Sequence, residues 1–209
     1  MPRVRVHQHV NPLSPYFRQS PKPVDVCALF ADPAKPLLID IGCARGRFLL
    51  KMAEEWPDWN FLGIEIREPL VEEANRLATE ANLTNLRYEF CNAMLWIDRL
   101  LQDLPDGVLQ NVTIQFPDPW FKKKHAKRRM VNPEMVETIA RHLSPGGKVF
   151  VQTDIEFLAE EMFAHFRANA AFTETPTSEN PFPVKTEREN AVESKDLPVY
   201  RSMWILSNK

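Results

Sequence analysis

No stretch of about 18 uncharged apolar residues occurs in this 209-residue chain, so the sequence predicts no membrane-spanning helix. Its first 15 residues carry charge but no apolar run, and we expect no secretory signal there. Only three cysteines are present, Cys27, Cys43 and Cys91, and none of them forms a CxxC pair. Sparse cysteines of this kind are typical of reduced thiols, so we expect a cytoplasmic protein without a structural zinc site.

Metal-ligand spacing is also missing among the histidines, which stand at His7, His9, His125, His142 and His165. We therefore expect no bound metal. The composition is that of an ordinary globular protein, with 44% hydrophobic and 26% charged residues. A chain of this length can bury about 70% of its unfolded surface, so its core needs neither a disulfide nor a metal.

Charge is distributed unevenly along the chain, although the net charge is only −2. Residues 1–24 carry four cations and no acid, and residues 122–129 (KKKHAKRR) carry six cations in eight positions. The rest of the chain is therefore acidic on balance. Two concentrated basic segments on an acidic body favour a polyanionic partner. For one isolated basic run, a solvated loop or a nuclear localisation signal is the alternative interpretation.

Short apolar runs alternate with amphipathic segments of helical period. Expected strands lie at residues 37–41, 61–66, 86–90, 112–116, 148–153 and 199–206. Expected helices lie at residues 47–56, 68–82, 93–101, 132–143 and 155–170. A proline-rich, polar segment separates the last helix from the last strand. The alternation is typical of an α/β, Rossmann-like sheet with mostly parallel strands and helices on both faces.

Ligands of such sheets bind outside the carboxyl ends of the strands. A carboxylate or an amide follows each of the first five expected strands, at Asp40, Glu65, Asn92, Asp118 and Asp154. Aspartate and asparagine favour strand ends and turns in general. That preference accounts for one or two of these residues but poorly for all five, so we expect a binding site at this edge.

The loop after the first strand, Gly42-Cys43-Ala44-Arg45-Gly46, does not fit the G-x-G-x-x-G pattern that cradles a pyrophosphate. A loop of this kind suits a ligand without phosphates, such as S-adenosyl-L-methionine. About 20 residues further on, an acid at the end of the second strand is placed to accept both ribose hydroxyls.

That acid is Glu65. Asn92, after the third strand, is placed to meet an adenine edge. Asp40 is expected to help bind the cationic methionine end, with a simple strand-end capping role as the alternative.

These residues belong to motifs that resemble the bacterial tRNA (guanine-N7-)-methyltransferases over nearly the whole chain. The motifs are DIGCARGRF (40–48), FLGIEIR (61–67), CNA (91–93), FPDPWFKKKHAKRR (116–129), QTD (152–154) and TERE (186–189). The fourth motif is the most specific. Two positions depart from the family: Ala44 stands where glycine is frequent, and Arg188 stands where the T-x-Y-E motif has an aromatic residue.

The resemblance implies a class I methyltransferase fold, with a seven-stranded sheet whose last strand runs antiparallel. It implies S-adenosyl-L-methionine as cofactor and methylation of guanine N7 in the variable loop of tRNA. The expected partner is tRNA, with no membrane and no DNA, and the protein is expected to be a monomer or a homodimer. Residues 1–24 are expected to form a basic N-terminal extension, and residues 25–209 a single methyltransferase domain.

The resemblance also implies roles for individual residues. Cofactor-binding residues would be Asp40, Gly42, Glu65, Asn92 and Asp118. Residues in contact with tRNA would be Lys122, Asp154, Thr186, Glu187, Arg188 and Glu189. Asp118 is also the expected catalytic residue.

Guanine N7 carries a free lone pair and no proton, so its methylation needs no general base, and catalysis should come from positioning and electrostatics. We expect Asp118 to stabilise the developing cation and to accept hydrogen bonds from guanine N1–H and the exocyclic amine, with Asp154 as second candidate. Pro117 and Pro119 restrict the backbone around Asp118. Trp120 is expected either to stack on a base or to anchor the loop.

Three alternatives remain open. One is an exocyclic-amine methyltransferase acting on adenine or cytosine, although such enzymes usually place an aromatic residue after two consecutive prolines, whereas Pro117 and Pro119 here flank Asp118. Another is a tRNA-binding module with an inactive cofactor pocket, which the intact set of acids disfavours. The third is an NAD-dependent oxidoreductase, which the glycine loop disfavours.

Overall fold

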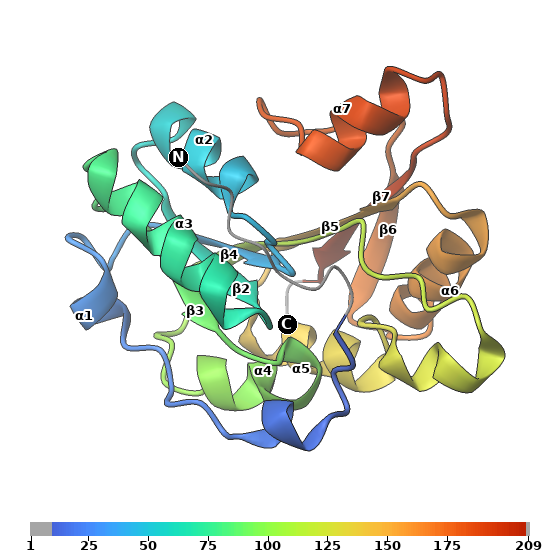
Figure 1. The fold of residues 1–209 in the computed structure, drawn as a ribbon, viewed down its shortest axis with the longest axis horizontal. Coiled ribbons are helices and arrows are strands. Elements are labelled where there is room, and N and C mark those ends of the chain that lie inside the picture. Colours follow the sequence, from blue (N-terminus) through green and yellow to red (C-terminus); the bar gives the residue numbers. More distant parts are fainter. Residues whose placement is uncertain (1–9, 208–209) are drawn as a thin grey trace.

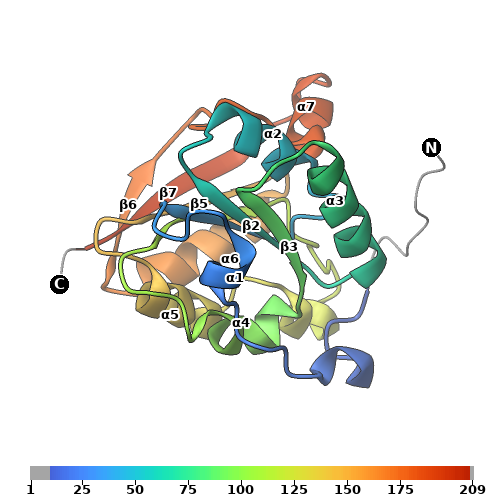
Figure 2. The same ribbon diagram turned by 90° about the vertical axis from the view of Figure 1, so that its left-hand side faces the viewer.

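The computed structural model describes residues 10–207, which form one seven-stranded sheet with helices on both faces (Figures 1 and 2). The strands are β1 (Leu37–Ile41), β2 (Asn60–Glu65), β3 (Leu86–Phe90), β4 (Leu109–Gln115), β5 (Lys148–Thr153), β6 (Phe172–Pro176) and β7 (Tyr200–Leu206). Their order across the sheet is β3-β2-β1-β4-β5-β7-β6. All pairs from β3 through to β5 are parallel, whereas β7 runs antiparallel to both β5 and β6. The expected mostly parallel sheet with an antiparallel last strand is confirmed.

The helices connect these strands across both faces. The α-helices are α1 (Val26–Leu29), α2 (Arg47–Glu55), α3 (Glu68–Glu80), α4 (Ala93–Leu101), α5 (Pro133–His142), α6 (Glu156–Arg167) and α7 (Glu187–Glu193). Two short 3-10 helices are η1 (Pro15–Arg18) and η2 (Lys123–Arg128), the second within the basic run. None of the helices in residues 10–207 combines the length and the apolar character that a membrane span requires.

Two hydrophobic clusters hold the layers together, one on each face of the sheet. Helices α2 and α3 lie over one face of the sheet, and α4, α5 and α6 lie over the other (Figure 1). The side chains of each set of helices belong to one of the two clusters. Central strand β1 contributes to both, since Leu38 belongs to the first cluster while Leu37 and Ile39 belong to the second. This alternation follows from the two-residue period of a strand. Burial on both faces also explains why β1 is apolar throughout except at Asp40.

Several elements differ from the sequence prediction. Strand β4 begins three residues earlier than expected and ends at Gln115, because Phe116 adopts a left-handed φ of 51° that no strand can contain. The polar segment after α6 contains two unpredicted elements, β6 and α7. Strand β6 owes its conformation to pairing with β7 at the sheet edge. The N-terminal elements η1 and α1 were also unpredicted.

Candidate functional site

A cavity of about 850 Å³ opens at the carboxyl ends of the parallel strands. Its lining includes a polar residue at or just after the carboxyl end of each of β1 to β5: Asp40, Glu65, Asn92, Asp118 and Asp154. The topology causes this convergence, because parallel strands all end at the same edge of a sheet. Among residues 10–207, no group of three or more histidine, cysteine, aspartate or glutamate side chains could hold a metal ion.

The loop after β1 forms one wall of the cavity. It turns sharply, with Gly42, Ala44 and Gly46 all at positive φ. The Tyr88 hydroxyl of β3 donates a hydrogen bond of 2.6 Å to the carbonyl oxygen of Gly46. A side-chain carbon at Gly46 would lie 2.5 Å from the Tyr88 ring, so only glycine fits there. Tyr88 therefore holds the loop from behind and leaves its other side to the cavity.

Asp40 is a buried carboxyl group on the floor of the cavity, with 4% of its surface exposed. Its Oδ1 accepts a hydrogen bond of 2.6 Å from the hydroxyl of Thr113 on β4. Burial raises the pKa of Asp40 to about 6, and the Thr113 hydrogen bond offsets part of that rise. A cationic group placed in the cavity would favour the ionised carboxylate, because opposite charges attract strongly at a buried position.

Gln115 also faces the cavity, two residues beyond Thr113 on β4. Its Nε2 is buried and has no hydrogen-bond partner of good geometry among the residues that the structure describes, although Gln115 is close enough to Asp40 to lower the pKa of that carboxyl. A buried donor without a partner costs about 1–3 kcal/mol, so this atom points to a ligand acceptor. Sequence reasoning missed Gln115, although a polar residue at the end of a buried strand was a usable signal.

Glu65 ends β2 and is 3% exposed. Its two carboxylate oxygens accept hydrogen bonds of 2.9 Å from Nε and Nη2 of Arg67, and Oε1 also accepts one of 3.0 Å from the Arg67 backbone N–H. This fork fixes the orientation of the carboxylate; Oε1 accepts two hydrogen bonds, and Oε2 retains a further lone pair. The charge of Asp118 also acts on Arg67, contributing with the Glu65 hydrogen bonds to its raised pKa. Arg67 was not anticipated from the sequence.

Asn92 lies at the start of α4 and is 5% exposed. Its side-chain nitrogen donates hydrogen bonds to the carbonyl oxygens of Pro12 at 2.8 Å and Phe17 at 3.4 Å. The amide nitrogen thus holds the N-terminal segment, of which Val10 and Pro12 line the cavity. The group through which Asn92 could meet an adenine amine is its side-chain oxygen, which accepts hydrogen bonds.

Asp118 stands in a strained loop that follows β4. Phe116 and Trp120, on either side of it, have φ values of 51° and 43°. Left-handed backbone costs a residue other than glycine about 1–2 kcal/mol, and it persists where the surroundings hold it. Arg129 supplies that support by donating from Nε to the Pro119 carbonyl at 3.0 Å and from Nη2 to the Trp120 carbonyl at 3.3 Å. The loop therefore presents Asp118 in one defined conformation.

The basic run divides into structural and exposed cations. Arg129 holds the Asp118 loop and pairs with Glu161 of α6, while the Arg128 guanidinium lies 4.9 Å from the centroid of the Trp120 ring. Trp120 is half-buried, contacts Arg128 and His125 and also lines the cavity, so both of its expected roles, stacking on a base and anchoring the loop, stay open. The exposed cations are Lys122, Lys123, Lys124 and Lys127. These four lysines are the cations of the run most accessible to phosphates.

The first residues of α7 form the opposite rim of the cavity. Thr186 caps the helix, because its hydroxyl oxygen accepts a hydrogen bond of 3.1 Å from the Glu189 backbone N–H. Glu187 pairs with Arg47 at the start of α2, and Arg188 pairs with Asp154 after β5. Thr186, Glu187 and Arg188 all line the cavity.

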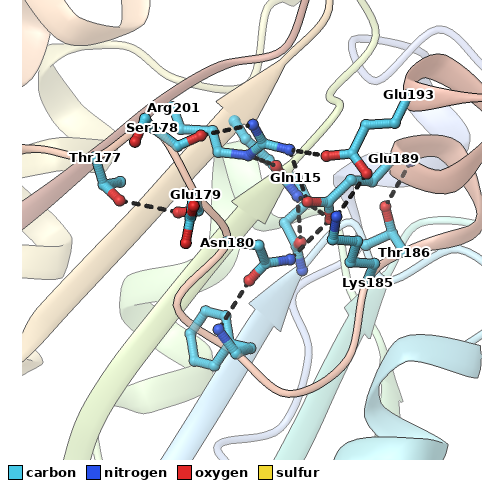
Figure 3. Close-up of polar contacts among 12 residues, drawn as sticks. Gln115, Thr177, Ser178, Glu179, Asn180, Lys185, Thr186, Glu189, Glu193 and Arg201 are labelled. Carbon is cyan, nitrogen blue, oxygen red and sulfur yellow. Dashed lines mark hydrogen bonds and ion pairs between the residues drawn. The ribbon is translucent and has the colours of Figure 1, made fainter. Parts of the chain in front are cut away.

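Glu189 does not face the cavity, which corrects the expectation that it contacts tRNA. It is fully buried, and it forms an ion pair of 2.8 Å with Arg201 of β7 (Figure 3). Its Oε2 accepts hydrogen bonds from Gln152 at 3.0 Å and Asn180 at 2.8 Å. The physical reason is helical geometry: three residues beyond the cap, the side chain points inward, onto the sheet.

This buried polar cluster joins α7 to the sheet. Arg201 also pairs with Glu193 at 2.7 Å and donates to the Gln152 oxygen at 3.1 Å. Gln152 in turn donates to the Gln115 oxygen at 2.8 Å. A continuous chain of hydrogen bonds therefore runs from α7 to Gln115 on the cavity wall. Sequence reasoning missed Arg201 and Gln152, whose partners are distant along the chain.

Comparison with known proteins places the chain among methyltransferases. The family model described as "Putative methyltransferase" matches residues 34–202. A tRNA (guanine-N(7)-)-methyltransferase of Synechococcus elongatus is 55% identical over 208 residues, covering 98% of each protein. The enzyme of that name from Trichormus variabilis is 52% identical, covering 98% of this chain and 97% of the relative.

Solved structures show the same fold at low sequence identity. The antibiotic-resistance methyltransferase Kmr superposes with a TM-score of 0.58 at 19% identity, covering 88% of this chain and 90% of the other. The aminoglycoside resistance methyltransferase NpmB1 superposes with a TM-score of 0.56 at 21% identity, covering 87% and 90%. The expected class I methyltransferase fold is therefore confirmed.

Proposed function

This chain belongs to the tRNA (guanine-N(7)-)-methyltransferase family, and from that premise we propose that it methylates N7 of a guanosine in the variable loop of tRNA, with S-adenosyl-L-methionine as methyl donor. The observation that carries the proposal is the set of side chains gathered in one cavity. A buried acid, a partnerless buried amide and a fixed glutamate lie on its cofactor side, and Asp118 lies beside the exposed lysines.

The cavity suits the amino-acid end of the cofactor. The buried Asp40 carboxylate would pair with the ligand's ammonium group, and the partnerless Nε2 of Gln115 would donate to its carboxylate. The turn at Gly42 would let the backbone approach the ligand closely. These assignments would give the Gln115 amide a hydrogen-bond acceptor and the buried Asp40 carboxylate a cationic partner.

The adenosyl end has its own candidates. Glu65, oriented by Arg67, would accept a hydrogen bond from a ribose hydroxyl at its Oε2, and it could accept from both hydroxyls once a side-chain nitrogen of Arg67 gives way. Asn92 would accept from the adenine amine through its side-chain oxygen, because its nitrogen already holds Pro12. Asp118 lines the cavity and precedes the basic run by four residues, so we assign it a role in binding both the cofactor and the substrate.

When bound, S-adenosyl-L-methionine supplies an electrophilic methyl group on a sulfonium. Guanine N7 has a lone pair and no proton, so the protein would only need to align N7 with that methyl group, and no base would be required. Asp118 would stabilise the positive charge that develops on the guanine ring and would accept hydrogen bonds from N1–H and the exocyclic amine. Its loop, held by Arg129, makes that carboxylate preorganised. Asp154 is a second acidic group at the rim, paired with Arg188.

Substrate binding would use the rim of the cavity and the basic run. Lys122 and the neighbouring exposed lysines would contact phosphates. Thr186, Glu187 and Arg188 would face the RNA from α7. Glu189 stays outside this set, because its oxygens are engaged inside the protein.

Mass spectrometry of nucleosides tests the proposal. Unmodified tRNA is incubated with the protein and methyl-labelled S-adenosyl-L-methionine, then digested and separated. Label in 7-methylguanosine supports the proposal, whereas label in an N-methylated adenosine or cytidine would identify an exocyclic-amine methyltransferase. If no nucleoside carries label and calorimetry detects no cofactor binding, the protein is instead a tRNA-binding module without activity.

A further inference from the structure

Two exposed phenylalanines lie side by side at the mouth of the cavity. Phe121 and Phe157 are 67% and 36% exposed, and their rings meet edge to face with centroids 5.9 Å apart. The other large hydrophobic side chains exposed among the described residues are Tyr16, Leu95 and Leu197. Paired exposed aromatic rings expose apolar area to water without contributing to the core, which indicates a binding role.

The position of the pair connects it to the proposed active site. Phe121 lines the cavity, three residues after Asp118, and directly precedes the exposed Lys122. Phe157 lies in the first turn of α6, three residues after Asp154. The two rings therefore bridge the Asp118 loop and the segment after β5, on the side of the cavity where the lysines begin.

Arg129 fixes the geometry of this pair. Its guanidinium lies 5.0 Å from the centroid of the Phe157 ring, while its nitrogens donate to the carbonyls of Pro119 and Trp120 and pair with Glu161. Phe157 thus has a cation over its ring and an edge-to-face contact with Phe121. Held in this way, Phe157 gives the Phe121 ring a fixed neighbour, which reduces the conformational entropy that Phe121 loses when a ligand stacks on it.

We propose that Phe121, supported by Phe157, is a stacking platform for an unpaired nucleobase of the tRNA that neighbours the target guanosine. Single-stranded RNA is recognised by aromatic rings that stack on splayed bases and by cations that bind the flanking phosphates. The pair offers the flat apolar face, and Lys122, Lys123 and Lys124 offer the charges. The inference rests on the proposed function, because it takes the guanosine to occupy the cavity beside the platform.

The positive charge next to the two rings favours RNA over a protein as the partner of this surface. The rings lie against a run of exposed lysines, and two side chains are too few for the apolar centre of a protein interface, which typically buries about 800 Å² on each partner. A base with its phosphates matches both the size and the charge of the surface.

Steady-state kinetics with unmodified tRNA tests the platform. Phe121→Ala should raise the KM for tRNA about 5- to 100-fold, the loss expected for one stacked base, while kcat at saturating tRNA and the Kd for S-adenosyl-L-methionine stay near wild type. Phe121→Trp should restore the KM, because indole also stacks. Leu197→Ala, which removes an exposed apolar side chain outside the cavity lining, is the matched control and should change nothing.

A tRNA with an abasic site beside the methylated guanosine completes the test. Removing that base should weaken binding to the wild type but not to Phe121→Ala, because the variant has already lost the contact. A wild-type KM in Phe121→Ala, or equal sensitivity of both proteins to the abasic site, overturns the platform. Those outcomes require that the wild type forms 7-methylguanosine, so failure of the proposed function is recognised separately, by the absence of that product.

Discussion

Asp40 is the residue whose titration should be most visible. Burial raises its pKa to about 6 from the usual 3.8, so the folded state binds a proton that the unfolded state releases between these values. Stability therefore falls as pH rises from about 4 to 6, and the destabilisation is complete above pH 6. The shift corresponds to roughly 3 kcal/mol.

Asp40→Asn should consequently be at least as stable as the wild type at pH 8, yet lose most affinity for S-adenosyl-L-methionine, because the ammonium partner is gone. Its stability should also lack the fall between pH 4 and 6. Chemical denaturation across that range and calorimetric titration of the cofactor measure the two effects. Tight cofactor binding by the variant would contradict the assignment of Asp40.

Ala44 offers a second prediction at the residue scale. It adopts a φ of 50°, a region that glycine enters without strain and alanine enters at a cost of about 1 kcal/mol. Ala44→Gly should raise the free energy of unfolding by roughly 0.5 kcal/mol, after the greater entropy of the unfolded glycine chain is counted. Ala164→Gly, at an exposed position inside α6, is the control and should destabilise by about 1 kcal/mol. A lower melting temperature for Ala44→Gly than for the wild type would refute the claim that the backbone at Ala44 is strained.

How far single residues were predictable depended on the range of their interactions. The acids at strand ends could be identified because their position follows from local pattern and the geometry of parallel sheets. Arg67 and Arg201 could not, because their roles arise from partners that only folding brings together. Gln115 carried a local signal, as a polar residue at the end of a buried strand, but its contact with Gln152 also arises only on folding. Glu189 was misassigned for the same reason. Its motif lies at the rim of the cavity, but Glu189 itself stands on the side of α7 that faces the sheet, and it is buried.

At the scale of elements, the buried cluster under α7 determines where the rim residues lie. Glu189→Gln leaves Arg201, which is 7% exposed, with an incomplete set of partners. Removing one member of a buried ion pair costs about 3 kcal/mol. We expect a loss of that order in denaturant unfolding, together with a higher KM for tRNA, since α7 would no longer hold its cap and Arg188 in place.

The matched control is Glu187→Gln, which breaks the exposed pair with Arg47 two residues away. Exposed pairs contribute about 0–1 kcal/mol, so this variant should unfold almost like the wild type. Equal stability of the two variants would show that the buried cluster does not support α7.

The elements themselves were predicted where hydrophobic periodicity was strong. The β1–α2–β2–α3 half needed little correction, because each segment carries its own apolar pattern. Strand β6 was missed since it is short, polar and held at an edge by β7. Helix α7 was missed although its T-x-x-E spacing at residues 186–189 is a helix-start signature, because the surrounding prolines suggested a loop.

Across the whole molecule, charge should govern the encounter with tRNA. The exposed lysines of the basic run lie beside the cavity, on a protein of net charge −2. The plot of log affinity against log salt should be linear, with a slope of about −0.7 to −0.9 per phosphate contact. Arg3 and Arg5 of the basic N-terminal extension lie outside the described residues, as do His7 and His9.

Filter binding measures that slope when the salt concentration is varied around physiological ionic strength, from about 50 to about 300 mM. Reversing Lys123 and Lys124 to glutamate should make it shallower by about 1 to 2 units, whereas reversing Lys51 on α2 should not. An affinity independent of salt would contradict phosphate binding by the basic run.

The central claim, that Asp118 serves methyl transfer to guanine N7 in the variable loop, has a direct test. Borohydride followed by aniline cleaves RNA at 7-methylguanosine, so tRNA treated with wild-type protein and S-adenosyl-L-methionine should break at one position in that loop. With Asp118→Ala, the rate at which this cleavable site forms should fall at least 100-fold, while the affinity for S-adenosyl-L-methionine weakens much less. Intact tRNA after wild-type treatment, or near-normal cleavage with the variant, would contradict the account.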